Sequence, residues 1–438
     1  MQIGKKKRGP IIFGLLLCVA TSVRAQQLEN LSFNIDSFFR YDTDFPPGNS
    51  TGGVICLNPI LRYTSQLFEG NFSPFLSLDS DGLPQLAIAN LSVLAHPTDS
   101  FTIQTGRFPY IRSPSVLLGN SSWFAGSVTP EQIVNGTFPA SRSDNLLVCS
   151  FSRNIVYVTA AFAPFQPLLS WPDPSSSLFS RRNLKDSFED IFGNVSTLNS
   201  VSWIDSDSSG FFDVNPAVSV EVGIRADRVH IALSGFEGTD RSPAVLYRVI
   251  PLTVSDYGKF NVEMKHLTAR IYGAGLTAEI TGNSFRVWAD DTITADKNVA
   301  LGDPYDEPAE WQISEKTLAC ACTTGFSLSF FSGFLECGSE WRNTSYIDCS
   351  DCVTEPFLNR AIYAYADTQY WQGLLRGEVS LIYSLYDGSF LSSCTVYMKT
   401  GLAGSIRLSM ILPQGDDTTE LGQFGRNHSM LFLAAFSY

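Results

Sequence analysis

The sequence has 438 residues, a formal net charge of −13 and only 17% charged residues. Such an acidic chain is a poor partner for nucleic acid and for anionic lipid headgroups, so we expect no nucleic-acid binding. Aromatic residues are abundant at 13%, with 32 Phe and 16 Tyr, which favours strands over helices. Beyond the first residues no window holds about 18 consecutive apolar residues, which excludes a helical membrane protein.

The first 25 residues have the pattern of a secretory signal peptide. A basic run at Lys5–Arg8 precedes the apolar stretch 11–20, and Val23-Arg24-Ala25 forms a small-residue cleavage site. A retained anchor and a lipoprotein acylated at Cys18 are weaker alternatives, because the stretch is short and Leu17 is large. Cleavage after Ala25 removes five basic residues, which leaves 25 basic against 43 acidic residues and a net charge of −18. We expect residues 26–438 to form a single domain.

Alternation of apolar and polar residues predicts strands through the first part of the mature chain. The expected strands are 31–41, 54–64, 71–78, 86–95, 101–108, 146–152 and 155–162. Between them, residues 109–145 form a long insertion rich in Gly, Pro and Ser. This insertion could fold inward as a constriction or plug, or lie outside, and the sequence leaves both alternatives open.

The clearest alternation runs from Val218 to Arg225, where four apolar residues alternate with Ser, Glu, Gly and Arg. Asp227-Arg228 follows, and the pattern then resumes, so residues 217–236 are predicted to form a tight hairpin. Two further hairpins are predicted, one from 259–272 through Gly273-Ala274-Gly275 to 276–280 and one from 377–386 through Asp387-Gly388 to 390–399. The remaining expected strands are 286–289, 318–330, 333–341, 362–370, 405–412 and 430–438.

The connections between these strands are unequal in length. Tight turns such as Asp227-Arg228 and Asp387-Gly388 alternate with long polar stretches at 166–210 and 290–316. Short turns at one end and long loops at the other are typical of barrels that cross an outer membrane. Many predicted strands have nine or ten residues, the length that a tilted strand needs to cross a bilayer.

The C-terminus gives the most specific local clue. Met430, Phe432, Ala434, Phe436 and Tyr438 alternate with other residues, and the chain ends on the aromatic Tyr438. This pattern resembles the terminal strand of bacterial outer-membrane β-barrel proteins. In those proteins the final aromatic residue and its alternating apolar neighbours, here Phe432, Phe436 and Tyr438, are recognised by the barrel assembly machinery. No single porin-like family is indicated.

The resemblance implies an all-β fold, namely a closed antiparallel transmembrane β-barrel of about 14 strands, within a range of 12 to 18. Sheets that enter hydrocarbon must close, because every backbone N–H and C=O needs a partner there. Val218, Val220, Val222 and Ile224 would then contact outer-membrane lipid, and the alternating polar residues would face a water-filled lumen. The candidate pore-lining residues are Arg107, Arg153, Glu221, Arg225, Glu263, Lys265, Arg270, Glu279, Arg376, Glu378 and Arg407.

Other chemistry has weaker support. Eight cysteines remain after cleavage, and Cys349 with Cys352 is a candidate loop disulfide, with free thiols or a metal site as alternatives. Asp205-Ser-Asp207-Ser-Ser-Gly210 begins like a calcium loop but has Pro216 where a bidentate Glu belongs. No catalytic motif is present, so we expect no enzyme, no cofactor and no metal.

The function that these patterns favour is an exported outer-membrane porin that lets small hydrophilic solutes diffuse passively, as a monomer or a homo-oligomer. A plugged barrel that transports hydrophobic or specific ligands is one alternative. Another is a secreted β-sandwich adhesin or binding module, because the period-two pattern of a sandwich is identical in one dimension. Several Asn-x-Ser/Thr triplets, beginning at Asn30, Asn49, Asn71, Asn90, Asn120, Asn135, Asn194, Asn343 and Asn427, would suit a secreted eukaryotic glycoprotein.

Overall fold

The structure is a computed structural model of the chain. It describes residues 31–43, 53–65, 67–78, 84–110, 112–115, 117–119, 123–124, 143–164, 184–185, 187–189, 195–204, 216–240, 244–252, 258–267, 269–306, 309–347, 349, 358–399, 404–416, 419, 421 and 428–437. In the strands within 31–58, 75–78, 84–89 and 428–437 only the backbone is described. The expected signal peptide and the calcium-like loop lie outside the described residues. No helix in the described ranges is long and apolar enough to cross a membrane.

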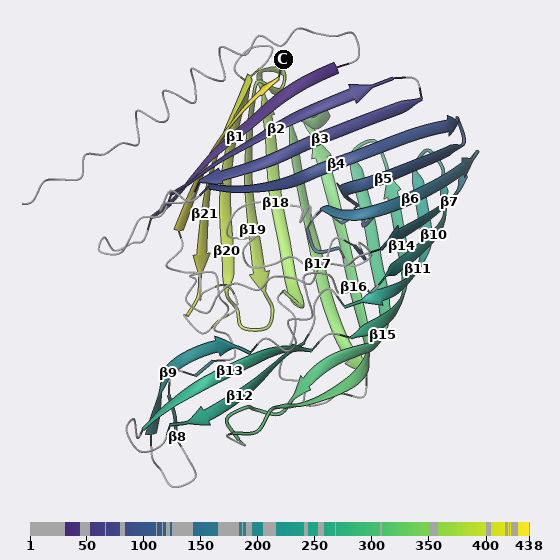
Figure 1. Ribbon diagram of the computed structural model, residues 1–438. Coiled ribbons are helices and arrows are strands. Elements are labelled where there is room, and N and C mark those ends of the chain that lie inside the picture. The colour runs from purple at the N-terminus through teal and green to yellow at the C-terminus, as the bar shows by residue number, and fades with distance from the viewer. Residues whose placement is uncertain are drawn as a thin grey trace, which may run out of the picture.

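Eighteen strands form one large antiparallel sheet (Figure 1). Its first strands are β1 (Leu31–Thr43), β2 (Gly53–Thr64), β3 (Phe68–Leu78), β4 (Pro84–Thr98), β5 (Phe101–Pro109), β6 (Ser143–Arg153) and β7 (Val156–Ala163). The next are β10 (Ala217–Arg225), β11 (Val229–Thr239), β14 (Arg270–Thr281), β15 (Phe285–Leu301), β16 (Ile313–Phe330) and β17 (Leu335–Ile347). The last are β18 (Arg360–Tyr370), β19 (Leu375–Ser384), β20 (Phe390–Lys399), β21 (Gly404–Gln414) and β22 (His428–Ser437).

The first and last strands of the chain are paired with each other. β1 pairs with β2 on one side and with β22 on the other, with Phe39 opposite Phe432. Every other strand of the large sheet likewise pairs with two neighbours. The sheet is therefore all-β and antiparallel as expected, but the expected number of about 14 strands is too low. β2 and β4 are longer than the strands predicted at 54–64 and 86–95. Only residues 286–289 of β15 are predicted as a strand from the sequence.

The two ends of the sheet differ in the length of their connections. At one end, which we call the short-turn end, the connections have two to four residues, such as 154–155 and 226–228. Two of them contain the 3-10 turns η1 (Phe331–Gly333) and η2 (Trp371–Gly373). At the other end, the long-connection end, they have five residues or more. Asp387-Gly388 lies at this second end, opposite to Asp227-Arg228, so the two turns do not belong to one set.

A second, four-stranded sheet lies beyond the long-connection end (Figure 1). It consists of β8 (Ser187–Glu189), β9 (Val195–Trp203), β12 (Ala244–Pro251) and β13 (Lys259–Leu267). Val249, Phe260 and Met264 form its buried core together with Tyr305 from the β15–β16 connection. The same connection covers the edge of β12, because Ala309 N donates to Val249 O at 2.6 Å. The small sheet is therefore held against the end of the large one.

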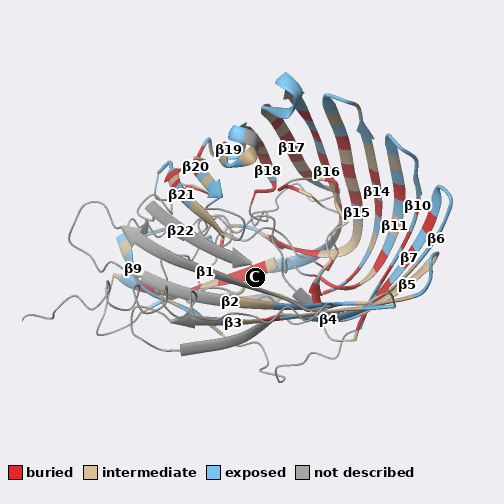
Figure 2. Ribbon diagram, turned by 90° about the horizontal axis from the view of Figure 1, so that it is seen from above, coloured by how far each residue is buried: buried red, intermediate tan, exposed pale blue. Residues whose placement is uncertain are grey.

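Where the side chains of the large sheet are described, they alternate between two environments along most strands (Figure 2). In β10, Val220 is 44% exposed whereas Ser219 is 7% exposed, and Val222 and Glu221 repeat the contrast. We call the side with the exposed apolar residues the outer face and the opposite side the inner face. A soluble sandwich would show the reverse, because its apolar residues would be buried between layers. The large sheet therefore carries its apolar side chains outward.

Three predicted local structures are wrong. The hairpin expected across Gly273-Ala274-Gly275 does not exist, because β14 runs straight through these residues and β13 belongs to the small sheet. A Cβ at Gly273 would lie 2.4 Å from the Trp123 ring, so the glycine makes room for that side chain and does not turn the chain. The long connection expected over 290–316 is reduced to residues 302–312, since β15 extends to Leu301 and β16 begins at Ile313. The long connection expected over 166–210 contains β8 and β9.

Candidate functional site

The described residues within 110–124 of the 109–145 insertion lie on the inner face of the large sheet, and we call them the inner segment. Arg112 Nη1 lies 3.6 Å from Glu221 Oε1 on β10, and Arg286 on β15 donates to Pro114 O at 2.7 Å. Thr323 on β16 donates to Leu118 O at 2.9 Å. The inner segment therefore folds inward, which is one of the two alternatives that the sequence leaves open for the insertion.

Two buried carboxylates hold the inner segment to the wall. Glu340 on β17 is fully buried and accepts hydrogen bonds from Ser115 Oγ at 2.9 Å, Leu117 N at 3.0 Å and Leu118 N at 3.1 Å. Asp290 on β15, also fully buried, accepts a hydrogen bond from Ser113 Oγ. Hydrogen bonds to an ionised acceptor are about twice as strong as neutral ones. The two acids therefore fix the segment at points on neighbouring parts of the inner face.

Aromatic packing holds the end of the inner segment. Trp123 stacks on Phe236 of β11 with centroids 5.1 Å apart, and its Nε1 donates to Ser234 Oγ at 3.2 Å. Phe124 packs edge-on against the same Phe236 and against Tyr110. Burial raises the pKa of Tyr110, although the guanidinium of Arg112 above its ring opposes that shift.

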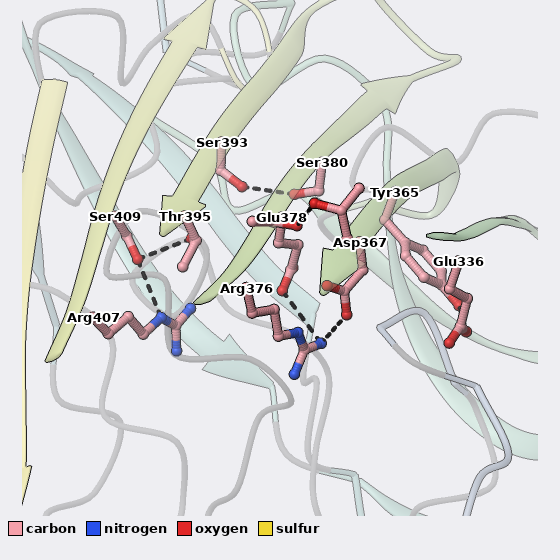
Figure 3. Close-up of polar contacts among 12 residues, drawn as sticks. Glu336, Tyr365, Asp367, Arg376, Glu378, Ser380, Ser393, Thr395, Arg407 and Ser409 are labelled. Atoms are coloured by element: carbon pink, nitrogen blue, oxygen red, sulfur yellow. Dashed lines mark hydrogen bonds and ion pairs between the residues drawn. The ribbon is translucent and has the colours of Figure 1, made fainter. Parts of the chain in front are cut away.

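The inner face of β18–β21, beside the segment, carries paired charges (Figure 3). Arg376 on β19 forms an ion pair with Asp367 on β18 and lies 3.9 Å from Glu378. Tyr365 on β18 donates to Glu336 of β17 at 2.9 Å. The positive charge of Arg376 therefore lies beside two acidic residues, Asp367 and Glu378, so the net charge of these three residues is negative.

Hydroxyl groups continue this inner face across β19–β21 (Figure 3). Ser380 and Ser393 share a hydrogen bond of 2.7 Å, and Thr395 donates to Ser409 at 2.9 Å. Arg407 on β21 donates through Nε to the same Ser409 oxygen at 3.2 Å. Hydroxyls can both donate and accept, so this wall can exchange hydrogen bonds with water and with polar solutes.

The structure places the eleven expected lining residues in three locations. Those on the inner face, by the register of their strands, are Glu221, Arg225, Glu279, Arg376, Glu378 and Arg407. They do not form one cluster. Arg112 of the inner segment approaches Glu221, and Arg286 Nε binds Glu279 Oε1 at 2.6 Å. Arg376 and Glu378 lie in the network of Figure 3.

The other five residues do not lie on the inner face. Arg107, Arg153 and Arg270 share the outer face with exposed apolar neighbours such as Leu91, which is opposite Arg107. Each lies near a strand end, where a long side chain can reach water beyond the apolar face. Glu263 and Lys265 belong to the small sheet, where Glu263 binds Arg248 and Lys265 lies 4.2 Å above the ring of Trp311.

Several inner-face charges were not predicted. Those with contacts described above are Asp290, Glu336, Glu340 and Asp367 on the sheet, with Arg286 and, from the inner segment, Arg112. The alternation of Glu336, Glu340 and Arg342 along β17 is a signal that could have located part of this set. No such signal exists for Arg112, because the inner segment has no regular period.

Outcomes for the cysteines and the C-terminus are partial. Cys349 is disulfide-bonded, and Cys352 lies outside the described residues. Cys149, Cys320, Cys322, Cys337 and Cys394 are free. Phe432 and Phe436 lie in β22, opposite Leu408 and Gly404, whereas Tyr438 lies outside the described residues. Within the described ranges no group of His, Cys, Asp and Glu residues is arranged to hold a metal ion.

No protein family and no curated protein matches the sequence. Solved structures do match the fold. OccAB1 of Acinetobacter baumannii aligns over 93% of this chain and 96% of its own, with 9% identity and a TM-score of 0.50. A loop-deletion mutant of OmpT, an outer membrane protein of Vibrio cholerae, aligns over 93% and 99% with 10% identity and a TM-score of 0.38. A mutant of the Rh. blastica porin aligns over the same shares with 11% identity and a TM-score of 0.39.

The fold thus resembles that of the porin-like outer-membrane β-barrel proteins as a class, which confirms the resemblance at the level of the class, whereas the C-terminal assembly signal stays a prediction.

Proposed function

We propose that this protein is a channel of the bacterial outer membrane through which small hydrophilic solutes diffuse passively. The observation that carries the proposal is the outward apolar face. Val218, Val220, Val222 and Ile224 are all exposed while Ser219 and Glu221 between them are buried. A water-soluble protein would not expose such continuous apolar rows, whereas hydrocarbon would cover them favourably.

We infer that the large sheet closes into a transmembrane barrel of 18 strands. The pairing of β1 with β22 supports closure, because it leaves neither terminal strand as a free edge. Closure is what a sheet needs in hydrocarbon, where an unpaired backbone group costs several kcal/mol. The polar inner face would then line a water-filled lumen that the inner segment narrows.

The proposed orientation places the short-turn end in the periplasm and the long-connection end outside, as in other barrels of this kind. The small sheet would then lie at the outer mouth. Residues 1–25 would direct Sec-type export and be removed. The remaining partners in this proposal are outer-membrane lipid, the barrel assembly machinery acting on Phe432, Phe436 and Tyr438, small solutes, and further copies of the chain in a homo-oligomer. The proposed activity is not enzymatic and uses no cofactor.

Conductance of the purified mature chain in planar lipid bilayers tests this function. Insertion should produce discrete current steps whose size is stable in time. A plugged transporter is the second candidate, supported by the apolar packing of Leu117 and Leu118 of the inner segment with Leu358, Tyr363 and Ile382. It would insert into the bilayer without current steps. A mature chain that stays soluble without detergent would contradict both candidates.

A further inference from the structure

The outer face carries a groove of about 490 Å³ across β14–β17. Ala278, Ala289 and Thr324 form its floor and are directly opposite one another on three adjacent strands. Their small side chains leave the backbone accessible and so create the depression. Larger side chains border this floor, namely Ile280, Val287, Phe326 and Trp341. The groove is therefore an apolar depression within the face that the proposed function places in the membrane.

A row of polar side chains lies beside the groove, one step toward the long-connection end. Asp291, Cys322, Asn343 and Arg360 are directly opposite one another on β15, β16, β17 and β18. Asp291 Oδ1 is buried and has no hydrogen-bond partner among the described residues, although the Asp291 carboxylate interacts with the Cys322 thiol. Asn343 Nδ2 donates to Ser345 Oγ at 3.3 Å, and Arg360 is exposed. Polar groups on the outer face of a barrel are costly in hydrocarbon unless a partner satisfies them.

The two features lie at heights that suit one amphiphilic molecule. Arg360 begins β18 at the long-connection end, whereas Trp341 lies six residues from the short-turn end of β17 and Ala289 four residues from that of β15. With a rise of about 3.4 Å per residue and a tilt of about 40°, Arg360 lies about 10 Å or more above the groove. An acyl chain attached to a headgroup at Arg360 can therefore reach the groove.

We propose that this groove and row bind an acylated, phosphate-bearing lipid of the outer leaflet, an inference that rests on the proposed membrane location. The chain packs into the groove along Trp341. The phosphate contacts the Arg360 guanidinium, and the hydroxyl or amide groups of the lipid contact Asn343 and Asp291. The negative net charge of the protein opposes any general attraction to anionic lipid, so binding would depend on the local contact between the phosphate and the Arg360 guanidinium.

Native mass spectrometry of the detergent-purified full chain, titrated with diphosphorylated lipid A or its dephosphorylated form, tests the proposal. The wild-type chain should retain the phosphorylated lipid preferentially. Arg360→Gln should lower that retention about ten-fold, the loss expected for one charge-assisted contact, and reduce the preference for phosphate. Ala289→Phe should fill the groove and weaken the binding of both lipids equally. Leu233→Phe, at an exposed outer-face position of β11, is the matched control and should change the binding of neither lipid.

Equal retention of both lipids by wild type and Arg360→Gln would overturn the phosphate assignment, and unchanged binding in Ala289→Phe would overturn the groove as the acyl site. Since Arg360 is exposed at a strand end, Arg360→Gln remains informative if Ala289→Phe does not fold. Planar-bilayer conductance separates this inference from the proposed function. A chain that conducts but retains no lipid contradicts only the lipid site, whereas a chain that neither inserts nor conducts contradicts the channel.

Discussion

Among single residues, Glu340 has the largest expected effect on the lumen. It is fully buried on β17 and accepts three hydrogen bonds from the inner segment. Glu340→Gln keeps the shape of the side chain but removes its charge and one acceptor oxygen, which should weaken the attachment by about 2 kcal/mol. We expect larger and noisier single-channel conductance and faster proteolysis of the segment, measured on the refolded variant in planar bilayers and in vesicles.

Glu336→Gln is the control for that experiment. Glu336 lies on the inner face of the same strand but binds Tyr365 of the wall, not the inner segment. The single-channel conductance of Glu336→Gln should remain near the wild-type value. If both variants conduct like the wild type, Glu340 does not fix the constriction, and the inner segment must be held mainly by the packing of Trp123 and Phe124.

At the scale of the strand, alternation between the outer and inner face makes a sharp prediction. Val222→Arg places a charge on the outer face in β10 and should lower the free energy of unfolding in lipid vesicles by about 2 to 4 kcal/mol, the cost of arginine near the bilayer midplane. Ser152→Arg, an exposed inner-face position of β6 opposite Tyr157, should change it by less than about 1 kcal/mol. Urea titration of both variants against wild type measures the difference, and equal losses would contradict the assignment of faces.

Individual strands were largely predictable from the sequence because period-two alternation depends only on local residues. The hairpin 217–236 and the strand at 318–330 were found in this way and match β10, β11 and β16. Alternation is misleading at Gly273 and Gly275, because glycine at the end of an alternating stretch usually signals a turn. Here the glycines lie within β14, and Gly273 leaves space for Trp123, a residue from a distant segment. A local pattern cannot show that requirement.

At the scale of the whole molecule, the number of strands and the set of inner residues were not predictable. Glu263 alternates as well as Glu221 does, yet it belongs to the small sheet, because sheet membership depends on long-range pairing. Likewise Arg107 and Glu221 are both charged residues in strands, but the register places them on opposite faces. Burial by the inner segment explains why Asp290 and Glu340 are tolerated inside, and no local signal reveals that contact.

The central claim is that the outer face contacts lipid and the inner face contacts water. Spin labels at Leu233→Cys on the outer face of β11 and at Gln369→Cys, an exposed inner-face position of β18, test it in a vesicle-reconstituted chain whose native cysteines are replaced. The label at 233 should collide mainly with oxygen dissolved in hydrocarbon, and the label at 369 mainly with a water-soluble nickel complex. Ready access of the nickel complex to the label at 233 would contradict the account.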